Sequence, residues 1–430
     1  MTSSPQIRHL AVRFVAVVAI CGGLLAAPAT SQVAVKAKTL HTMNGAPITD
    51  GVVVIGTDGK ISAVGPASRV RIPSGATVLE TEVATPGLVD VRSTLGLSGA
   101  YNSNVGPVRD QDQLETSSPI QPELRAIDAY NAREELIAYA RGFGVTTVHT
   151  GHGPGALISG RTMVVKTRGD SVEDALVEPA KMVAVTLGRL ASDFRSPGTR
   201  AKSVAMLRGA LLGAQDYLDK QKKAAEKAAE AEEDAEDGEG KGGGSGPPRD
   251  LRKETLAKVL EGEITMMVQA NSAVDIAGAL RLQKEFGFDM VIDGGAEAYL
   301  LLDEIKAAGV PVFVHAARAR IQNKTFEIAK ILNDAGIAFA VQTGHEGYVP
   351  KTRVLIFEVA HYAAHGLSAQ DALAAVTIDS AKLLGLDDRI GSLEVGKDGD
   401  VAMFTGDPFE YLTQVCGVLI EGEMVSDTCR

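Results

Sequence analysis

The sequence predicts an α/β protein in which a (β/α)8 TIM barrel carries a small β-sandwich domain built from both ends of the chain. Two observations lead to this prediction. Short apolar runs alternate with helical stretches through the middle of the chain, and strand pairs punctuated by glycine occur near both ends. The 430 residues, 45% of them apolar, suffice for one large core and a smaller companion domain.

The middle of the chain reads as repeated strand–helix units. The apolar runs that we expect to be strands are 144–150, 182–187, 264–270, 288–293, 310–316 and 337–343. Residues 123–141, 276–287 and 298–309 show helical periodicity, and the last two stretches end at glycine, a common residue after a helix. Because no dinucleotide-binding fingerprint accompanies these units, they favour a barrel over a doubly wound sheet, which remains the alternative.

Both ends of the chain have strand character. The stretch "GVVVIGTDGKISAVG" (51–65) predicts a hairpin, and 391–404 and 415–425 predict two further strand pairs. Chain termini often lie close together. We therefore expect residues 30–84 and 386–430 to form one composite β-sandwich domain, and residues 85–385 to form the barrel.

One segment interrupts the barrel pattern. Residues 222–250, "KKAAEKAAEAEEDAEDGEGKGGGSGPPRD", begin as a charged helix and pass into an acidic and then a glycine-rich tract. Such a composition buries too little apolar surface to become ordered. We expect a flexible, exposed insertion rather than a domain boundary.

The first 29 residues are typical of an export signal. Arg8 and Arg13 precede an apolar stretch (14–27), and Ala27-Pro28-Ala29 fits a cleavage site. Cleavage predicts a periplasmic or secreted protein with no membrane attachment; an uncleaved anchor is the alternative. The remaining chain has 41 Lys+Arg against 54 Asp+Glu, a net charge of −13, which argues against a nucleic-acid partner.

Two cysteines follow the signal segment, Cys416 and Cys429. An oxidising compartment permits a disulfide between them. The sequence leaves open whether they form this bond or remain two free thiols.

Several stretches resemble the amidohydrolase superfamily, in particular its imidazolonepropionase-like members. They are "TPGLVDV" (85–91), 125–160, "GGAEAYLLLDEIKAAGVPV" (294–312) and 366–409. The resemblance implies a hydrolase acting on carbon–nitrogen bonds other than peptide bonds. It also implies one or two divalent metal ions at the C-terminal mouth of the barrel, where the metal would activate water.

The metal-ligand positions that the resemblance implies hold other residues here. The family carries His-x-His after strand 1, one His after each of strands 5 and 6, and Asp after strand 8. In this chain those positions hold Arg92, Thr94, Gln269, Gly294 and Gly344. A guanidinium has no lone pair to donate to a metal and is always charged. We therefore predict a protein without cofactor; one divalent metal such as zinc is the alternative.

Other polar residues near strand ends are candidates for a relocated site. His149 and His152 follow strand 2, His315 follows strand 7, and His345 follows strand 8. They could form a displaced metal or acid–base site, or they could be ordinary hydrogen-bonded histidines.

Asp293 and Glu297 are candidates for a general acid or base, with helix caps or salt bridges to Arg92 as the alternative. His361 and His365 are four residues apart on a predicted helix, but without a zincin glutamate we expect surface residues. We expect Lys166 to be a solvated lysine at a strand end.

Three classes of function follow. The first is a weakly active or non-catalytic subunit, forming a homo-oligomer or pairing with an active amidohydrolase. The second is an active hydrolase with a relocated site near His149, His152, His315 and His345. The third is an exported small-molecule binding protein that uses the barrel mouth, with Arg92 holding an anion.

Overall fold

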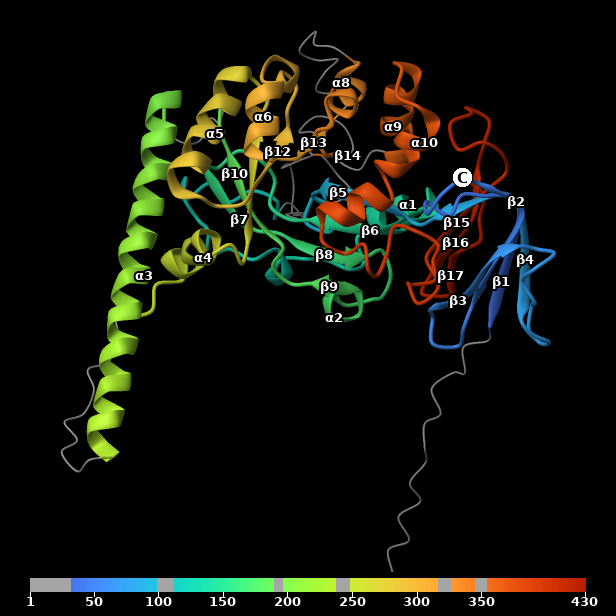
Figure 1. The fold of residues 1–430 in the computed structure, drawn as a ribbon, viewed down its shortest axis with the longest axis horizontal. Coiled ribbons are helices and arrows are strands. Elements are labelled where there is room, and N and C mark those ends of the chain that lie inside the picture. Colours follow the sequence, from blue (N-terminus) through green and yellow to red (C-terminus); the bar gives the residue numbers. More distant parts are fainter. Residues whose placement is uncertain (1–31, 99–111, 189–195, 237–247, 316–325, 345–353) are drawn as a thin grey trace, which may run out of the picture.

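The computed structural model describes residues 32–98, 112–188, 196–236, 248–315, 326–344 and 354–430 (Figure 1). The predicted export signal therefore lies outside the described residues. Within them the strands form sheets of seven, six and four strands. None of the described helices is long and apolar enough to cross a membrane.

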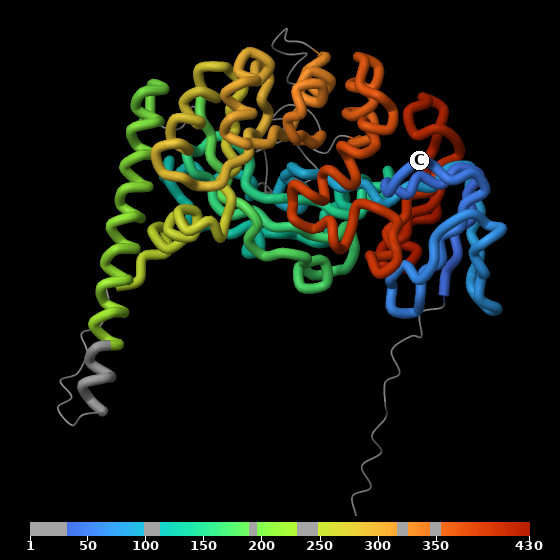
Figure 2. The backbone as a smooth tube through the Cα atoms, in the orientation of Figure 1, coloured from blue at the N-terminus to red at the C-terminus, as the bar shows by residue number. Residues whose placement is uncertain are grey.

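Both ends of the chain contribute to the seven-stranded sheet. Figure 2 shows the first strands and the last strands side by side. In spatial order the strands are β17 (Glu423–Ser426), β16 (Val415–Ile420), β15 (Val401–Phe404), β4 (Thr77–Pro86), β1 (Val33–Leu40), β2 (Ile48–Ile55) and β3 (Ile61–Pro66). The antiparallel pair β2–β3 is the predicted hairpin. The pairings give one continuous sheet rather than two separately bonded sheets, and 391–395 is not a strand.

The remaining strands lie in the middle of the chain. The four-stranded sheet has the order β5 (Leu88–Ser93), β6 (Val145–Thr150), β8 (Met163–Lys166) and β9 (Leu176–Glu178). The six-stranded sheet has the order β14 (Phe339–Val341), β13 (Val312–Val314), β12 (Met290–Gly294), β11 (Thr265–Ala270), β10 (Met182–Thr186) and β7 (Ile158–Arg161). From β10 to β14 all neighbours are parallel, as the strand–helix pattern predicts.

Two strands, β7 and β8, do not follow the all-parallel arrangement of a (β/α)8 barrel. β7 and β8 are separated only by Thr162, and they run antiparallel to β10 and β6. The connection from β6 to its neighbour β8 is 151–162, which contains β7 and no helix, whereas parallel neighbours are usually joined by a crossover helix. Between β5 and the residues after β14 the described chain has one isolated bridge, Ser93 to Gly344, so these strands do not form one closed sheet.

Helices stand along one side of the strands in Figure 1. They are α5 (Ala273–Phe286), α6 (Leu302–Ala308), α8 (Ile328–Ala335), α9 (Leu355–Ala364) and α10 (Ala369–Ala374). The described residues also form α1 (Glu135–Gly142), α2 (Val172–Ala175), α4 (Leu251–Leu260) and α11 (Ile378–Leu383), with short 3-10 turns at Ala126–Asp128 and Ala298–Leu300. As predicted, α5 and α6 end at left-handed glycines, Gly287 and Gly309.

The helix α3 (Arg200–Glu236) covers the first part of the expected insertion, which the sequence analysis describes as beginning with a charged helix. Leu207, Leu211 and Ala214 are buried against the core, and the helix continues past them into the charged segment. Alanine, glutamate and lysine are strong helix formers, so propensity extends a helix that packing has already nucleated. The far end of α3 projects beyond the body of the molecule (Figure 1), and residues 237–247 lie outside the described residues.

Lys166 is buried, contrary to the expectation of a solvated lysine. Its side chain is 2% exposed, and Nζ lies 3.0 Å from Asp398 Oδ2 and also donates to Asp400. Lys60 and Arg389 bind Asp398 as well. Because β8 runs antiparallel to β6, its carboxyl end lies away from the ends of the parallel strands and meets the composite sheet. The ion pairs therefore join the middle of the chain to this sheet.

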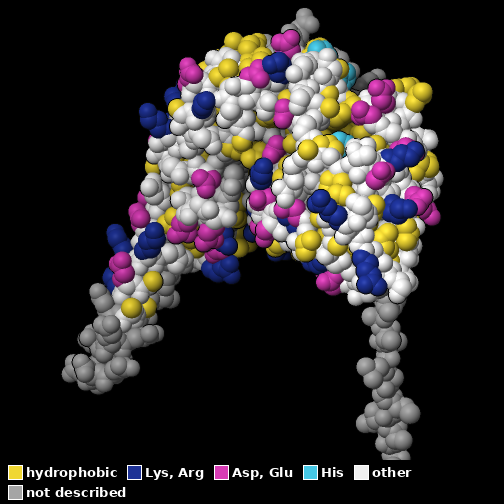
Figure 3. Space-filling model, turned by 45° about the vertical axis from the view of Figure 1, so that its right-hand side comes forward, with side chains coloured by type: hydrophobic (Ala, Val, Ile, Leu, Met, Phe, Trp, Pro, Cys, Tyr) yellow, Lys and Arg dark blue, Asp and Glu magenta, His cyan; other side chains and the backbone are white. Residues whose placement is uncertain are grey.

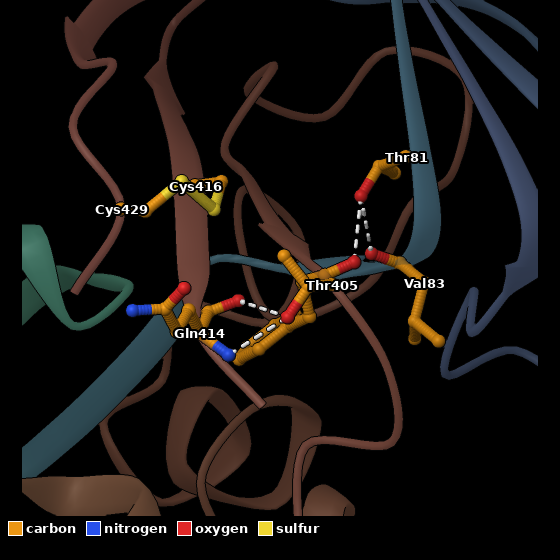
Figure 4. The surroundings of a disulfide bond; sticks show 7 residues. Thr81, Val83, Thr405, Gln414, Cys416 and Cys429 are labelled. Atoms are coloured by element: carbon orange, nitrogen blue, oxygen red, sulfur yellow. Dashed lines mark hydrogen bonds between the residues drawn. A yellow bond between two sulfur atoms is a disulfide. The ribbon is translucent and has the colours of Figure 1, made fainter. Parts of the chain in front are cut away.

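Cys416 and Cys429 form a disulfide, which settles the question that the sequence left open (Figure 4). Cys416 lies in β16, and Val415 beside it exchanges both backbone hydrogen bonds with Arg430 (2.9 and 3.0 Å). The last residues of the chain are thereby held against β16. On the face drawn in Figure 3, acidic and basic side chains are interspersed rather than gathered by sign.

Candidate active-site region

A small polar cavity lies where the carboxyl ends of β11, β12 and β13 meet Arg92 of β5. It is lined by Arg92, Pro154, Gln269, Asn271, Asp293, Gly294, His315 and Gln342. Its volume is about 10 Å³, the space of about one water molecule. The described side chains that line it therefore leave little more than the space of a water molecule between them.

Arg92 is the cation of this region. Its side chain is 3% exposed; Nη1 donates to the carbonyl oxygens of Ser93 (3.0 Å) and Gly151 (3.4 Å), and Nη2 donates to that of His152. Nε lies 3.7 Å from Asp293 Oδ2. Burial lowers the pKa of Arg92, and the nearby carboxylates of Asp293 and Asp90 act in the opposite direction. The guanidinium is therefore fully engaged by the protein.

Asp293 is held from two sides. Gln342 Nε2 donates to Asp293 Oδ1 (2.7 Å) and to the carbonyl oxygen of Phe313 (2.7 Å), while Arg92 faces the other carboxylate oxygen. This is the salt bridge to Arg92 that the sequence offered as the alternative to an acid–base role. In the described part of the lining, Asp293 is the only carboxylate and His315 the only imidazole.

Asp90 of β5 forms hydrogen bonds with Thr343, which follows β14. Its carboxylate accepts from the hydroxyl (2.5 Å) and the backbone N–H (3.2 Å) of Thr343, and from the backbone N–H of Arg92 (3.2 Å). Burial raises the pKa of Asp90 to about 6, although these hydrogen bonds oppose the shift. Gly344 N also donates to Arg92 O (2.9 Å), so the strand ends are tied without any ion.

The space beside Gly294 is already filled. A Cβ at this position would lie 2.4 Å from Asn271 Oδ1, and Gly294 has a left-handed φ of 92°. Asn271 Oδ1 is buried and has no hydrogen-bond partner among the described residues. A histidine at position 294 would therefore collide with Asn271.

The space beside Gly344 is filled by His315. A Cβ at position 344 would lie 2.1 Å from His315 Cδ2 and 2.6 Å from Nε2, and φ is 68°. His315 Nε2 donates to the carbonyl oxygen of Thr343 (2.7 Å), which fixes the ring in this place. An aspartate at this position would require the imidazole to move.

The residues at the family's ligand positions do not fit a divalent metal. Thr94 is buried, and its hydroxyl has no hydrogen-bond partner within the described part of the chain. Gln269 is partly buried and lines the cavity, and the glycines supply no side-chain donor. The described residues contain no group of three or more His, Cys, Asp or Glu side chains that could hold a metal. A borderline cation requires such lone pairs, and Arg92 repels it.

The histidines at the end of β6 and just after it, His149 and His152, do not line the cavity. His149 is completely buried; Nδ1 donates to Val91 O (2.7 Å) and Nε2 lies 2.5 Å from Thr162 Oγ1. Burial lowers the pKa of His149 to about 3 and that of His152 to about 4, and Arg92 adds to both shifts. Neither histidine lines the cavity. The proposed four-histidine constellation is therefore not assembled by its described members; His345 lies outside the described residues.

Glu297 caps a helix, in agreement with the alternative that the sequence offered: its Oε2 accepts from Ala273 N (2.6 Å) at the start of α5. His361 and His365 are exposed, and His365 stacks on Phe326 with ring centroids 4.9 Å apart. The sequence reasoning missed Asn271, Gln342 and Thr343. Asn271 and Gln342 lie two residues from the ligand positions 269 and 344, a spacing that can return side chains to one face of a strand.

Comparisons with known proteins identify the family. The profile of the "Amidohydrolase family" matches residues 201–425, more than half of the chain. An imidazolonepropionase of Rhizobium rhizogenes is 24% identical over 397 residues, covering 86% of this chain and 90% of that protein. An imidazolonepropionase of Maricaulis maris is 26% identical over 365 residues, covering 81% and 85%.

The solved structures agree. The crystal structure of an amidohydrolase from Thermotoga maritima has a TM-score of 0.81 and 27% identity, and the match covers 92% of this chain and all of that one. The chain belongs to the amidohydrolase family, a class of hydrolases with a TIM-barrel-type fold and an additional domain. Within that class it is an imidazolonepropionase-like protein.

Proposed function

We propose that this chain is an exported, metal-free member of its family that is weakly active or non-catalytic and acts as a subunit beside an active amidohydrolase. The observation that carries the proposal is Arg92 at a metal-ligand position, buried and bonded to three carbonyl oxygens. Metal-assisted hydrolysis needs an electrophile with open coordination positions. A guanidinium whose donors are committed to the protein does not provide one.

The changes around Arg92 support a rebuilt site rather than a single lost ligand. Asn271 takes the space beside Gly294, and His315 takes the space beside Gly344. Asp90 and Arg92 tie the end of β5 to Thr343 and Gly344. Because the strand ends are secured by the protein itself, the scaffold stays intact while its chemistry is lost.

Elemental analysis of the chain purified from its native host tests the metal claim. We expect less than stoichiometric zinc, manganese and iron, and a melting temperature that EDTA leaves unchanged. One equivalent of any of these metals, with a fall in melting temperature on chelation, would sink the claim. A tagged chain should also co-purify with an amidohydrolase whose metal-binding histidines are intact; a chain that remains alone contradicts the subunit role.

An active hydrolase with a relocated site is the competing function, and a substitution at Asp293 tests it. Asp293 is the only carboxylate among the described residues that line the cavity. If cyclic or N-acyl amides are hydrolysed, Asp293→Asn should abolish turnover, with Glu297→Gln as the control away from the cavity. Hydrolysis that depends on Asp293 in metal-free protein would replace the non-catalytic proposal.

The third class of function, a small-molecule binding protein in which Arg92 holds an anion at the barrel mouth, has less support. Arg92 is nearly inaccessible, and the cavity beside it holds about one water molecule.

A further inference from the structure

A larger cavity lies beside the carboxyl ends of β10 and β11, between the first turns of α3 and the helix α5. Its volume is about 400 Å³, within the range of roughly 300–1,000 Å³ typical of ligand sites. We call it the α3–α5 groove, and its lining includes Leu187, Arg200, Val204, Arg208, Val274 and Arg281. The groove lies at the end of the barrel strands where proteins of this fold bind ligands.

The groove carries an excess of positive charge. Among the described residues, three arginines line it against one carboxylate, Asp275, in a chain whose net charge is −11. Arg200 Nε binds Asp275 Oδ1 (2.6 Å), and Arg208 binds Glu285, which lies outside the lining. Arg281 makes no ion pair with any described residue. Its guanidinium remains available to an anion from solution.

The rest of the groove is apolar. Leu187 is buried, Val274 is 63% exposed, and Val204 is partly buried against the core. A Cβ at Gly278 would make ordinary contacts with Val204 Cγ2 (3.7 Å) and Arg281 Nη2 (3.9 Å), so these two groups border the same space. An exposed large aliphatic side chain beside an unpaired guanidinium matches a ligand with an alkyl portion and an anionic head.

Two other cavities lined by described residues lack this combination. A cavity of about 450 Å³ on the composite sheet contains lysines, but Lys36 pairs with Glu80 (2.5 Å) and Lys38 with Glu82 (2.6 Å). The cavity beside Arg92 is too small for more than a water molecule.

We propose that the α3–α5 groove binds an aliphatic carboxylate, with its carboxylate on Arg281 and its alkyl chain against Val274 and Val204. This goes beyond the proposed function, since it holds whether or not the site beside Asp293 retains catalysis. The carboxylate gains a charge-assisted hydrogen bond, and the alkyl chain removes Val274 from water.

Isothermal titration of the full chain with octanoate tests the proposal. We expect one equivalent to bind, and acetate and 1-octanol to bind at least about tenfold more weakly, because each lacks one half of the recognised ligand. Arg281→Gln should weaken octanoate binding about tenfold, since it removes the charge of the contact. Val274→Asp, at a position near the start of α5 where an acidic residue favours the helix, should abolish binding.

The matched control is Arg252→Gln, which removes an exposed arginine bonded to Glu123 outside the groove and should leave octanoate affinity unchanged. Equal binding of octanoate and 1-octanol would overturn the role of the charge. Equal affinities of the Arg281 and Arg252 variants, or no heat of binding with millimolar octanoate, would overturn the site.

Discussion

Restoring the aspartate at position 344 should destabilise the protein rather than rebuild a metal ligand. The Cβ that Gly344→Asp introduces would lie 2.1 Å from the His315 ring, and the ring is fixed by its hydrogen bond to Thr343 O. The ring or the backbone must therefore shift to admit the new side chain.

Two costs add at this position. A residue other than glycine at φ 68° costs about 1–2 kcal/mol. Overpacking against a fixed neighbour costs about 1–3 kcal/mol more. We expect the free energy of unfolding of Gly344→Asp to fall by about 2–5 kcal/mol in total.

Urea unfolding of four variants separates these costs. Gly309→Asp is the matched control, because Gly309 has nearly the same φ (65°) and a Cβ at that position would meet nothing within 4 Å. It should show the backbone cost alone. In a His315→Ala background, Gly344→Asp should cost about 1–3 kcal/mol less than in the natural chain. Equal costs in both backgrounds, or a Gly344→Asp variant as stable as the natural chain, would refute the reasoning.

Two further predictions follow from buried groups and a third from the disulfide. Lys166→Met leaves the buried Asp400 without its cation and takes one of three cations from Asp398, so it should lower the unfolding free energy by about 3–5 kcal/mol in urea titrations, whereas the exposed Lys330→Met should change it little. Burial lowers the pKa of His149 to about 3, so between about pH 6.5 and 3 only the unfolded chain binds a proton at this histidine, and the free energy of unfolding falls as the pH drops through that window. His149→Gln should therefore make the free energy of unfolding less dependent on pH. A slope that is the same in the variant and the natural chain would contradict this prediction. Replacing Cys416 and Cys429 by serine opens a loop with a sequence separation of 13 and should cost about 3 kcal/mol; a variant that unfolds at the same urea concentration as the natural chain under oxidising conditions would rule this out.

The fold was predictable where local patterning decides structure. The apolar runs at 264–270 and 288–293 became parallel strands, because alternation with amphipathic helices allows little else. The sequence analysis did not expect β7 and β8, which lie antiparallel to their neighbours. The connection 151–162 between β6 and β8 contains no helix, and periodicity alone does not show the direction of a strand.

The sequence located the residues at the ligand positions that the family pattern implies, but not the side chains that pack around them. Arg92, Gly294 and Gly344 could be located from the family pattern. That Asn271 and His315 fill the spaces beside the glycines depends on left-handed backbone geometry and on side-chain directions that emerge only in the folded chain. Lys166 shows the same limit, because its two aspartate partners lie more than 230 residues away in sequence.

The composite sheet determines when its strands can pair while the chain is being synthesised. β4 is bonded on one side to β1 and on the other to β15, and Thr81 bonds to Phe404, 323 residues later. A newly made chain must therefore keep one side of β4 unpaired until nearly all of the protein has been produced, and an unpaired strand edge is a template for association. A cell that exports this chain unfolded would bring both ends together in the same compartment, whereas a truncation before β15 would leave the open edge permanently exposed.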